Sequence, residues 1–133
     1  MKPFLLLVLL AAPAAAAPRS VWEGVYSSEQ AGRGQKAYAT ECARCHGEDL
    51  LGDPDSPPLI KEDFLKKWNG KSVGKLVEQT RKTMPSDTPG RLNRQLSTDI
   101  VTYLLSVNGF PAGQGELVYD LSLLNQIGIE SKK

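Results

Sequence analysis

Two thiols and an imidazole stand within five consecutive residues, in the order Cys42-Ala43-Arg44-Cys45-His46. In this C-x-x-C-H pattern, two cysteines form thioether bonds to the two vinyl groups of a haem. The histidine after the second cysteine then lies beneath the iron, where its imidazole nitrogen can be an axial ligand. The chain has only two cysteines and one histidine, so no other site competes for these residues. The spacing predicts a covalently attached haem c, held by Cys42 and Cys45 with His46 as an iron ligand.

The same three residues are open to other chemistry. In an oxidising compartment Cys42 and Cys45 would favour a disulfide. A C-x-x-C pair also occurs in thioredoxin-type redox proteins, but that fold needs strands and helices alternating around the motif, and the sequence has no convincing strand. A structural zinc site takes four ligands, whereas two cysteines and one histidine supply three. The balance favours haem over a redox disulfide or a zinc site.

A second iron ligand is expected from Met84. Met1 should be removed with the N-terminal leader described below, which leaves Met84 as the only methionine of the mature chain. It stands directly before Pro85 and off any helical stripe, whereas a methionine that fills a core usually lies on such a stripe. Thioether ligation stabilises Fe(II) and raises the reduction potential. An iron with His46 and Met84 as axial ligands has no open position for a substrate, so the pair predicts an electron carrier and not a catalyst.

The first sixteen residues have the three parts of a secretory signal. Met1-Lys2-Pro3 is a short positive start, residues 4–12 are apolar, and an alanine-rich segment with a cleavage site after Ala16 follows. The apolar run is shorter than the roughly 20 residues of a membrane span; a retained N-terminal anchor is the alternative. We expect residues 1–16 to be removed and residues 17–133 to form a single domain in the periplasm. The chain has 16 basic and 15 acidic residues, so its charge does not point to nucleic acid.

The pattern after the leader is all-α, with about four to five helices. Ser27 or Ser28, Ser72 and Ser97 are the expected N-caps, because a serine hydroxyl can accept a hydrogen bond from the backbone of the first turn. Met84-Pro85 ends the third helix, since proline disfavours helical backbone in the residue before it. The expected helices cover about residues 29–42, 61–68, 73–82 and 98–107, with a further short one within 117–125.

Gly34, Tyr38 and Cys42 recur at intervals of four residues and therefore share one face of the first expected helix. A glycine in line with a tyrosine and the first cysteine would let a second helix approach closely. Gly32 lies off this face, and we expect it only to weaken the helix, by roughly 1 kcal/mol relative to alanine.

Together these features resemble the class I cytochromes c. The matching residues are Gly34-x-x-x-Tyr38-x-x-x-Cys42-Ala43-Arg44-Cys45-His46-Gly47, Pro57-Pro58-Leu59, Thr83-Met84-Pro85 and Ile100-Val101-Thr102-Tyr103-Leu104-Leu105. The resemblance covers about residues 27–109 and implies the all-α cytochrome c fold. In that fold an N-terminal and a C-terminal helix cross, here with Gly34 and Tyr38 against Ile100 and Tyr103.

The resemblance also implies two contacts around the haem. The carbonyl oxygen of Pro57 would accept a hydrogen bond from Nδ1 of His46, which fixes the orientation of the imidazole and raises its basicity. Trp68 resembles the tryptophan that contacts a haem propionate in this family. The alternative for Trp68 is ordinary core packing against Phe64.

A narrower resemblance is to the small cytochromes and cytochrome domains that work with periplasmic dehydrogenases. The matching residues are Trp68-x-Gly70, Met84-Pro85 with Pro89-Gly90, and the stretch from Asn108 to Leu117. It implies a quinoprotein or molybdenum dehydrogenase as electron donor, and a terminal oxidase or another cytochrome as acceptor. The alternatives are a haem subunit held tightly in a dehydrogenase complex, and a haem enzyme or gas sensor with an open sixth position. Residues 110–133 extend beyond a minimal class I cytochrome and could wrap the domain or form a docking edge.

Charge is uneven along the chain. Residues 41–63 carry seven acids and two bases, whereas residues 66–94 carry eight bases and two acids. Either this surface is simply solvated and mixed in sign, or the charge separation orients the haem edge toward a redox partner. On the second interpretation Lys66, Lys67 and Arg81 belong to the docking surface.

Overall fold

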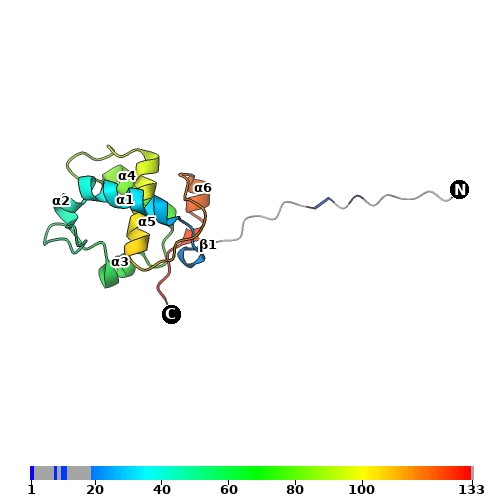
Figure 1. Cartoon of the computed structure of the whole chain (residues 1–133), viewed down its shortest axis with the longest axis horizontal. Helices are drawn as coiled ribbons and strands as arrows, with labels where there is room; N and C mark the ends of the chain where they lie inside the picture. The colour runs from blue at the N-terminus through cyan, green and yellow to red at the C-terminus, as the bar shows by residue number, and fades with distance from the viewer. Residues whose placement is uncertain (2–7, 9, 12–18, 133) are drawn as a thin grey trace.

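Helices α1 (Ser28–Glu41) and α5 (Arg94–Val107) cross and hold the rest of the molecule around them (Figure 1). The computed structural model describes residues 1, 8, 10, 11 and 19–132. Most of the expected signal sequence, with its cleavage site after Ala16, therefore lies outside the described residues. Among the described residues, no helix has both the length and the apolar character needed to span a bilayer. The predicted all-α architecture is confirmed.

The crossing of α1 and α5 depends on Gly34. A Cβ atom at this position would lie 1.9 Å from the carbonyl oxygen of Asp99 and 3.0 Å from Cβ of Tyr103, so only glycine fits between the two backbones. One turn later the rings of Tyr38 and Tyr103 pack with their centroids 5.3 Å apart. A Cβ atom at Gly32 would meet no atom within 4 Å. The predicted contact between the two helix faces is confirmed.

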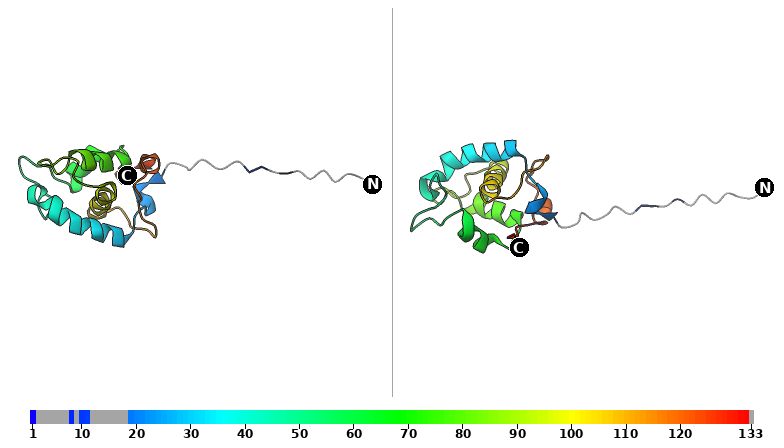
Figure 2. Two further views of the ribbon diagram at one scale, coloured as in Figure 1. Left: turned by 90° about the horizontal axis from the view of Figure 1, so that it is seen from above. Right: turned by 60° about the horizontal axis from the view of Figure 1, so that its bottom comes forward.

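Three further helices surround this pair. Helix α2 (Ala43–His46) continues from the end of α1, α3 (Lys61–Trp68) follows a long loop, and α4 (Val73–Thr83) packs against α5. Figures 1 and 2 show α2 at one end of the molecule. The predicted bounds of the α3 and α4 helices match the structure within one residue.

Serine and asparagine side chains set where the helices begin. The hydroxyl of Ser27 accepts a hydrogen bond from the backbone of Gln30 at 3.1 Å, and Ser72 caps α4 in the same way. The prediction that Ser97 caps the last long helix is wrong: Asn93 is the cap, so α5 begins at Arg94. The hydroxyl of Ser97 instead donates to the carbonyl oxygen of Asn93 at 2.9 Å and lies inside the helix.

The C-terminal residues from 110 to 132 wrap around the domain and complete its core. They contain the short helix α6 (Leu121–Leu124) and the strand β2 (Ile127–Gly128), which pairs in parallel with β1 (Arg19–Ser20). This small two-stranded sheet was not predicted. The tail contributes buried apolar side chains to the core, namely Phe110, Leu117, Leu124, Ile127 and Ile129.

The side chain of Gln30 fastens the tail to α1. Its Nε2 donates to the carbonyl oxygen of Leu117 at 2.7 Å, and its Oε1 accepts from the backbone N–H of Leu117 at 2.8 Å. Gln30 is fully buried, so these two hydrogen bonds satisfy polar atoms that would otherwise be costly to remove from water. The tail is thus part of the folded unit.

Tyr119 fastens the tail to α4. Its hydroxyl donates to Glu78, which also accepts from Arg81 at 3.1 Å and pairs with Lys82 at 3.0 Å. The guanidinium of Arg94 lies 5.4 Å from the centroid of the Tyr119 ring. The hydrogen bond from Arg81, followed by those from Tyr119 and Lys82, lowers the pKa of Glu78 to about 2.

This lowered pKa predicts acid sensitivity. The folded state binds the Glu78 proton more weakly than the unfolded chain, so the stabilisation is complete above about pH 5 and disappears as the pH falls toward 2. We expect the parent to lose about 2 kcal/mol more stability over this range than Glu78→Gln. Urea unfolding at several pH values measures the difference. Glu62→Gln, which removes an exposed ion pair, is the control and should follow the parent. Identical acid profiles for the parent and Glu78→Gln would contradict the prediction.

Candidate functional site

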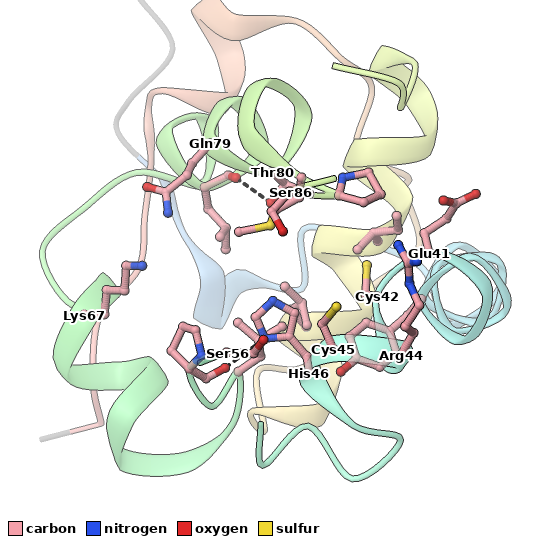
Figure 3. A pocket seen from close by; sticks show the side chains of 18 of the residues that line it. Glu41, Cys42, Arg44, Cys45, His46, Ser56, Lys67, Gln79, Thr80 and Ser86 are labelled. Carbon is pink, nitrogen blue, oxygen red and sulfur yellow. Dashed lines mark hydrogen bonds between the residues drawn. The ribbon is translucent and has the colours of Figure 1, made fainter. Parts of the chain in front are cut away.

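Cys42, Cys45, His46 and Met84 all line a single cleft. The cleft holds about 990 Å³ of empty space, including space open to solvent. Figure 3 shows the three motif side chains along one side, with Ser86, two residues after Met84, on the opposite side. The structure thus brings together residues 38 positions apart in the sequence.

His46 is held in one orientation by the loop that follows it. The imidazole is only 7 % exposed, and its Nδ1 lies 2.8 Å from the carbonyl oxygen of Pro57. A carbonyl can only accept, so Nδ1 carries the proton and donates. In the neutral imidazole with the proton on Nδ1, the other ring nitrogen, Nε2, carries the lone pair that can ligate a metal.

Residues 47–60 fold back so that Pro57 reaches the imidazole. The backbone N–H of Gly52 donates to the carbonyl oxygen of His46 at 2.8 Å, and that of Leu59 donates to Leu50 at 2.9 Å. Gly52 has a φ of +67°, and a Cβ atom there would lie 2.1 Å from the carbonyl oxygen of Ser56. Only glycine therefore allows this tight return, which the sequence signals by its density of glycine and proline.

The two cysteines lie where α1 turns into α2. Cys42 caps the end of α1, Cys45 is exposed, and both thiols are free. Burial, with a smaller contribution from Cys45, raises the pKa of Cys42 to about 11. A redox or nucleophilic cysteine needs a lowered pKa, because the thiolate is its reactive form. The site therefore does not have the electrostatics of a thioredoxin-type pair.

Met84 stands at the C-terminal end of α4, where the helix gives way to an extended backbone. Its backbone N–H donates to the carbonyl oxygen of Thr80 at 3.1 Å, which fixes the direction in which the side chain leaves the helix. The side chain is partly buried and lines the cleft. The structure thus places a thioether on the wall of the same cleft as the imidazole.

Trp68 lines the cleft from the end of α3 and is 3 % exposed. The ammonium groups of Lys67 and Lys71 lie 5.6 Å and 5.2 Å from its ring centroid. The expected contact of Trp68 with a haem propionate stays a prediction.

Two of the basic residues expected at a docking surface are paired within the chain: Lys66 with Glu62 at 3.0 Å, and Arg81 with Glu78.

The residues present fit a covalently bound haem with iron. Two free thiols stand three residues apart, an imidazole with a free Nε2 follows them, and a thioether lines the same cleft. Apolar side chains (Leu59, Leu76, Ile100 and Leu104) supply the remaining lining that a flat, apolar macrocycle requires. In the part of the chain that the structure describes, no group of three or more His, Cys, Asp or Glu side chains could hold a metal ion, so the zinc alternative gains no support.

Sequence reasoning missed several polar residues of the cleft. Lys67 and Gln79 line it on the side away from the cysteines, and Glu41 and Arg44 line it beside them (Figure 3). Helical spacing could have indicated Thr80, which also lines the cleft, because it lies four residues before Met84 and i and i+4 residues share a helix face. Gln79 lies five residues before Met84 and had no such signal. Glu41 and Arg44 could have been noted from their places next to the cysteines.

Comparisons with known proteins indicate the family and the fold of the chain. Residues 29–104 match the family model described as cytochrome C oxidase, cbb3-type, subunit III. No curated protein matches the chain. Among solved structures, the crystal structure of the sulfane dehydrogenase SoxCD from Paracoccus pantotrophus is similar, with a TM-score of 0.53 and 19 % sequence identity. The similarity covers 90 % of this chain and 68 % of that chain, and at this identity it shows a shared fold alone.

Proposed function

The chain belongs to the cytochrome c family whose model is described as cbb3-type cytochrome c oxidase subunit III, and we propose that it is a periplasmic carrier of single electrons with His46 and Met84 as axial ligands. Membership of the family implies haem c and electron transport, and Cys42 and Cys45 fit the attachment motif. When bound, the haem iron supplies a one-electron Fe(III)/Fe(II) couple.

One observation carries the proposal: His46 and Met84 line the same cleft, and Nδ1 of His46 is already engaged by Pro57. The hydrogen bond to Pro57 leaves Nε2 as the ligating nitrogen and keeps the imidazole from rotating. Cys42 and Cys45 would anchor the macrocycle beside it. If His46 and Met84 both hold the iron, no coordination position would be left for a substrate, which would suit electron transfer better than catalysis.

The periplasm and a dehydrogenase partner are part of the proposal. The signal-like sequence of residues 1–16 supports export, and the likeness to the sulfane dehydrogenase SoxCD agrees with the narrower resemblance. A quinoprotein or molybdenum dehydrogenase would supply electrons, and a terminal oxidase or another cytochrome would accept them. A stable complex with a large subunit during purification would favour the second candidate, a haem subunit of a dehydrogenase.

Covalent haem attachment is the direct test. We expect the full chain, produced with its leader in a bacterium that matures c-type cytochromes, to keep its haem through denaturing electrophoresis. Cys42→Ser/Cys45→Ser should lose it, because thioether bonds need both thiols. A redox titration of the parent should follow a one-electron curve. Extraction of the haem from the parent by acidified organic solvent would contradict the proposal.

A further inference from the structure

The loop from Met84 to Asn93 connects α4 to α5 and has few contacts of its own. Pro85 and Leu92 are buried, whereas residues 86–91 are exposed. Its backbone hydrogen bonds are local, from Thr88 to Pro85 at 3.0 Å and from Arg91 to Thr88 at 3.3 Å. Among the backbone hydrogen bonds of the described residues, none joins residues 85–92 to α1 or α2. Side chains must therefore hold this loop over the cysteines.

Two ion pairs do so. Nη2 of Arg44 lies 2.5 Å from Oδ2 of Asp87, and Arg91 contacts Glu41. Arg44 stands between the two cysteines, and Glu41 immediately precedes the first. Both pairs therefore join the loop that begins at Met84 to the segment that would anchor the haem. Figure 3 shows Glu41 and Arg44 beside Cys42 and Cys45.

The signs of the charges are crossed. In the segment that contains the cysteines, the acid Glu41 precedes the base Arg44. In the loop, the acid Asp87 precedes the base Arg91. Arg44 pairs with Asp87, and Glu41 pairs with Arg91. A shift of the loop that moved either residue to the other partner would bring like charges together, which is unfavourable. The two pairs thus specify one position of the loop. They also support each other, because forming one raises the effective concentration of the second.

We propose that Arg44–Asp87 and Glu41–Arg91, together called the ionic latch, are positioning contacts that hold the Met84 loop closed so that the thioether stays at the sixth ligand position. This inference rests on the proposed function, in which Met84 is that ligand. Three of the four side chains are more than half exposed, so salt reaches and screens both pairs. Retention of Met84 on the iron therefore depends on ionic strength.

Competition with imidazole on the ferric holoprotein tests the latch. Imidazole displaces Met84, and loss of the sulfur-to-iron(III) charge-transfer band reports the displacement. For the parent, we expect the apparent imidazole affinity to rise about tenfold from about 0.01 M to about 1 M salt, because the Debye length falls from about 30 Å to about 3 Å. Asp87→Asn/Arg91→Gln should bind imidazole about tenfold more tightly than the parent at low salt and should show no salt dependence, since each exposed pair contributes up to about fivefold.

Two controls make the result specific to the latch. Lys66→Gln removes an exposed ion pair of α3 and should behave as the parent does. Asp87→Arg should loosen Met84 most, because it faces Arg44, whereas Arg44→Asp/Asp87→Arg restores an attractive pair and should recover most of the parent's resistance to imidazole. Such recovery requires the pairing itself and cannot come from a general loss of stability.

The outcomes separate the latch from the function on which it rests. A parent that shows the charge-transfer band, but whose imidazole affinity and salt dependence equal those of Asp87→Asn/Arg91→Gln, overturns the latch and leaves Met84 ligation intact. A parent without the band, with the same imidazole affinity as Met84→Ala, overturns both the latch and Met84 ligation. Failure of the swapped pair to recover resistance also counts against the latch.

Discussion

Replacing Met84 with alanine is expected to open the sixth coordination position of the haem iron. The parent should not bind carbon monoxide in the ferrous state, because the thioether occupies that position, whereas the Met84→Ala variant should bind it readily. The variant should also lose the sulfur-to-iron(III) charge-transfer band. Its reduction potential should fall by on the order of 0.2 V, a fraction of the roughly 0.8 V that axial ligands span, since thioether ligation favours Fe(II).

Ser86→Ala provides a matched control for Met84→Ala. Ser86 belongs to the same loop and lines the same cleft, but its hydroxyl cannot replace a thioether as a ligand that favours Fe(II). The control should exclude carbon monoxide and keep its band. A parent that already binds carbon monoxide would show that the sixth position is open, and the haem-enzyme or gas-sensor alternative would then replace the carrier.

Replacing Gly34 with alanine is expected to destabilise the fold by about 3 kcal/mol, at the upper end of the cost of overpacking. The added Cβ would lie 1.9 Å from the carbonyl oxygen of Asp99 and 2.6 Å from its carbonyl carbon. These are backbone atoms within α5, so no side-chain rotation relieves the overlap and the two helices must separate. Guanidinium unfolding followed by circular dichroism measures the effect.

Replacing Gly32, two residues earlier, with alanine should raise the stability of the protein instead of lowering it. Gly32 lies on α1 as well, but a Cβ atom there meets nothing within 4 Å. Gly32→Ala should therefore stabilise the protein by about 0.5–1 kcal/mol, because alanine loses less conformational entropy on entering a helix. Stabilisation by both substitutions would contradict the close crossing of α1 and α5.

Local signals in the sequence were enough to place most of the helices. Ser72 precedes a helical stripe with no competing cap nearby, and the first helix left a choice only between the neighbours Ser27 and Ser28; the structure uses Ser27 and Ser72 as N-caps. The last long helix was predicted to begin at Ser97, whereas its cap is Asn93. The side chain of Asn93 accepts a hydrogen bond from the backbone N–H of Leu96 and so caps the helix. The hydroxyl of Ser97 donates to the carbonyl oxygen of Asn93, a common alternative for serine within a helix.

The sequence predicted four residues that line the cleft, because the signals for them are local. Cys42, Cys45 and His46 lie within five residues, and Met84 interrupts a helical pattern directly before a proline. The sequence predicted a short helix in the tail, which is α6, but neither the hydrogen bonds that fasten the tail nor the ionic latch, because both depend on partners far apart in sequence. Leu117 meets Gln30 across 87 residues, and Asp87 meets Arg44 across 43, and neither pairing leaves a periodic trace.

The pairing of β1 with β2 brings the two ends of the domain together. Arg19 pairs with Ile127 and Ser20 with Gly128, so the first and last strands of the described residues lie side by side. Figures 1 and 2 show this pair at the opposite end of the molecule from α2, which carries His46. A flexible tether or a neighbouring domain joined at either end would therefore emerge on the side away from the cleft. Such a fusion would concentrate the domain near a partner enzyme and leave the cleft uncovered.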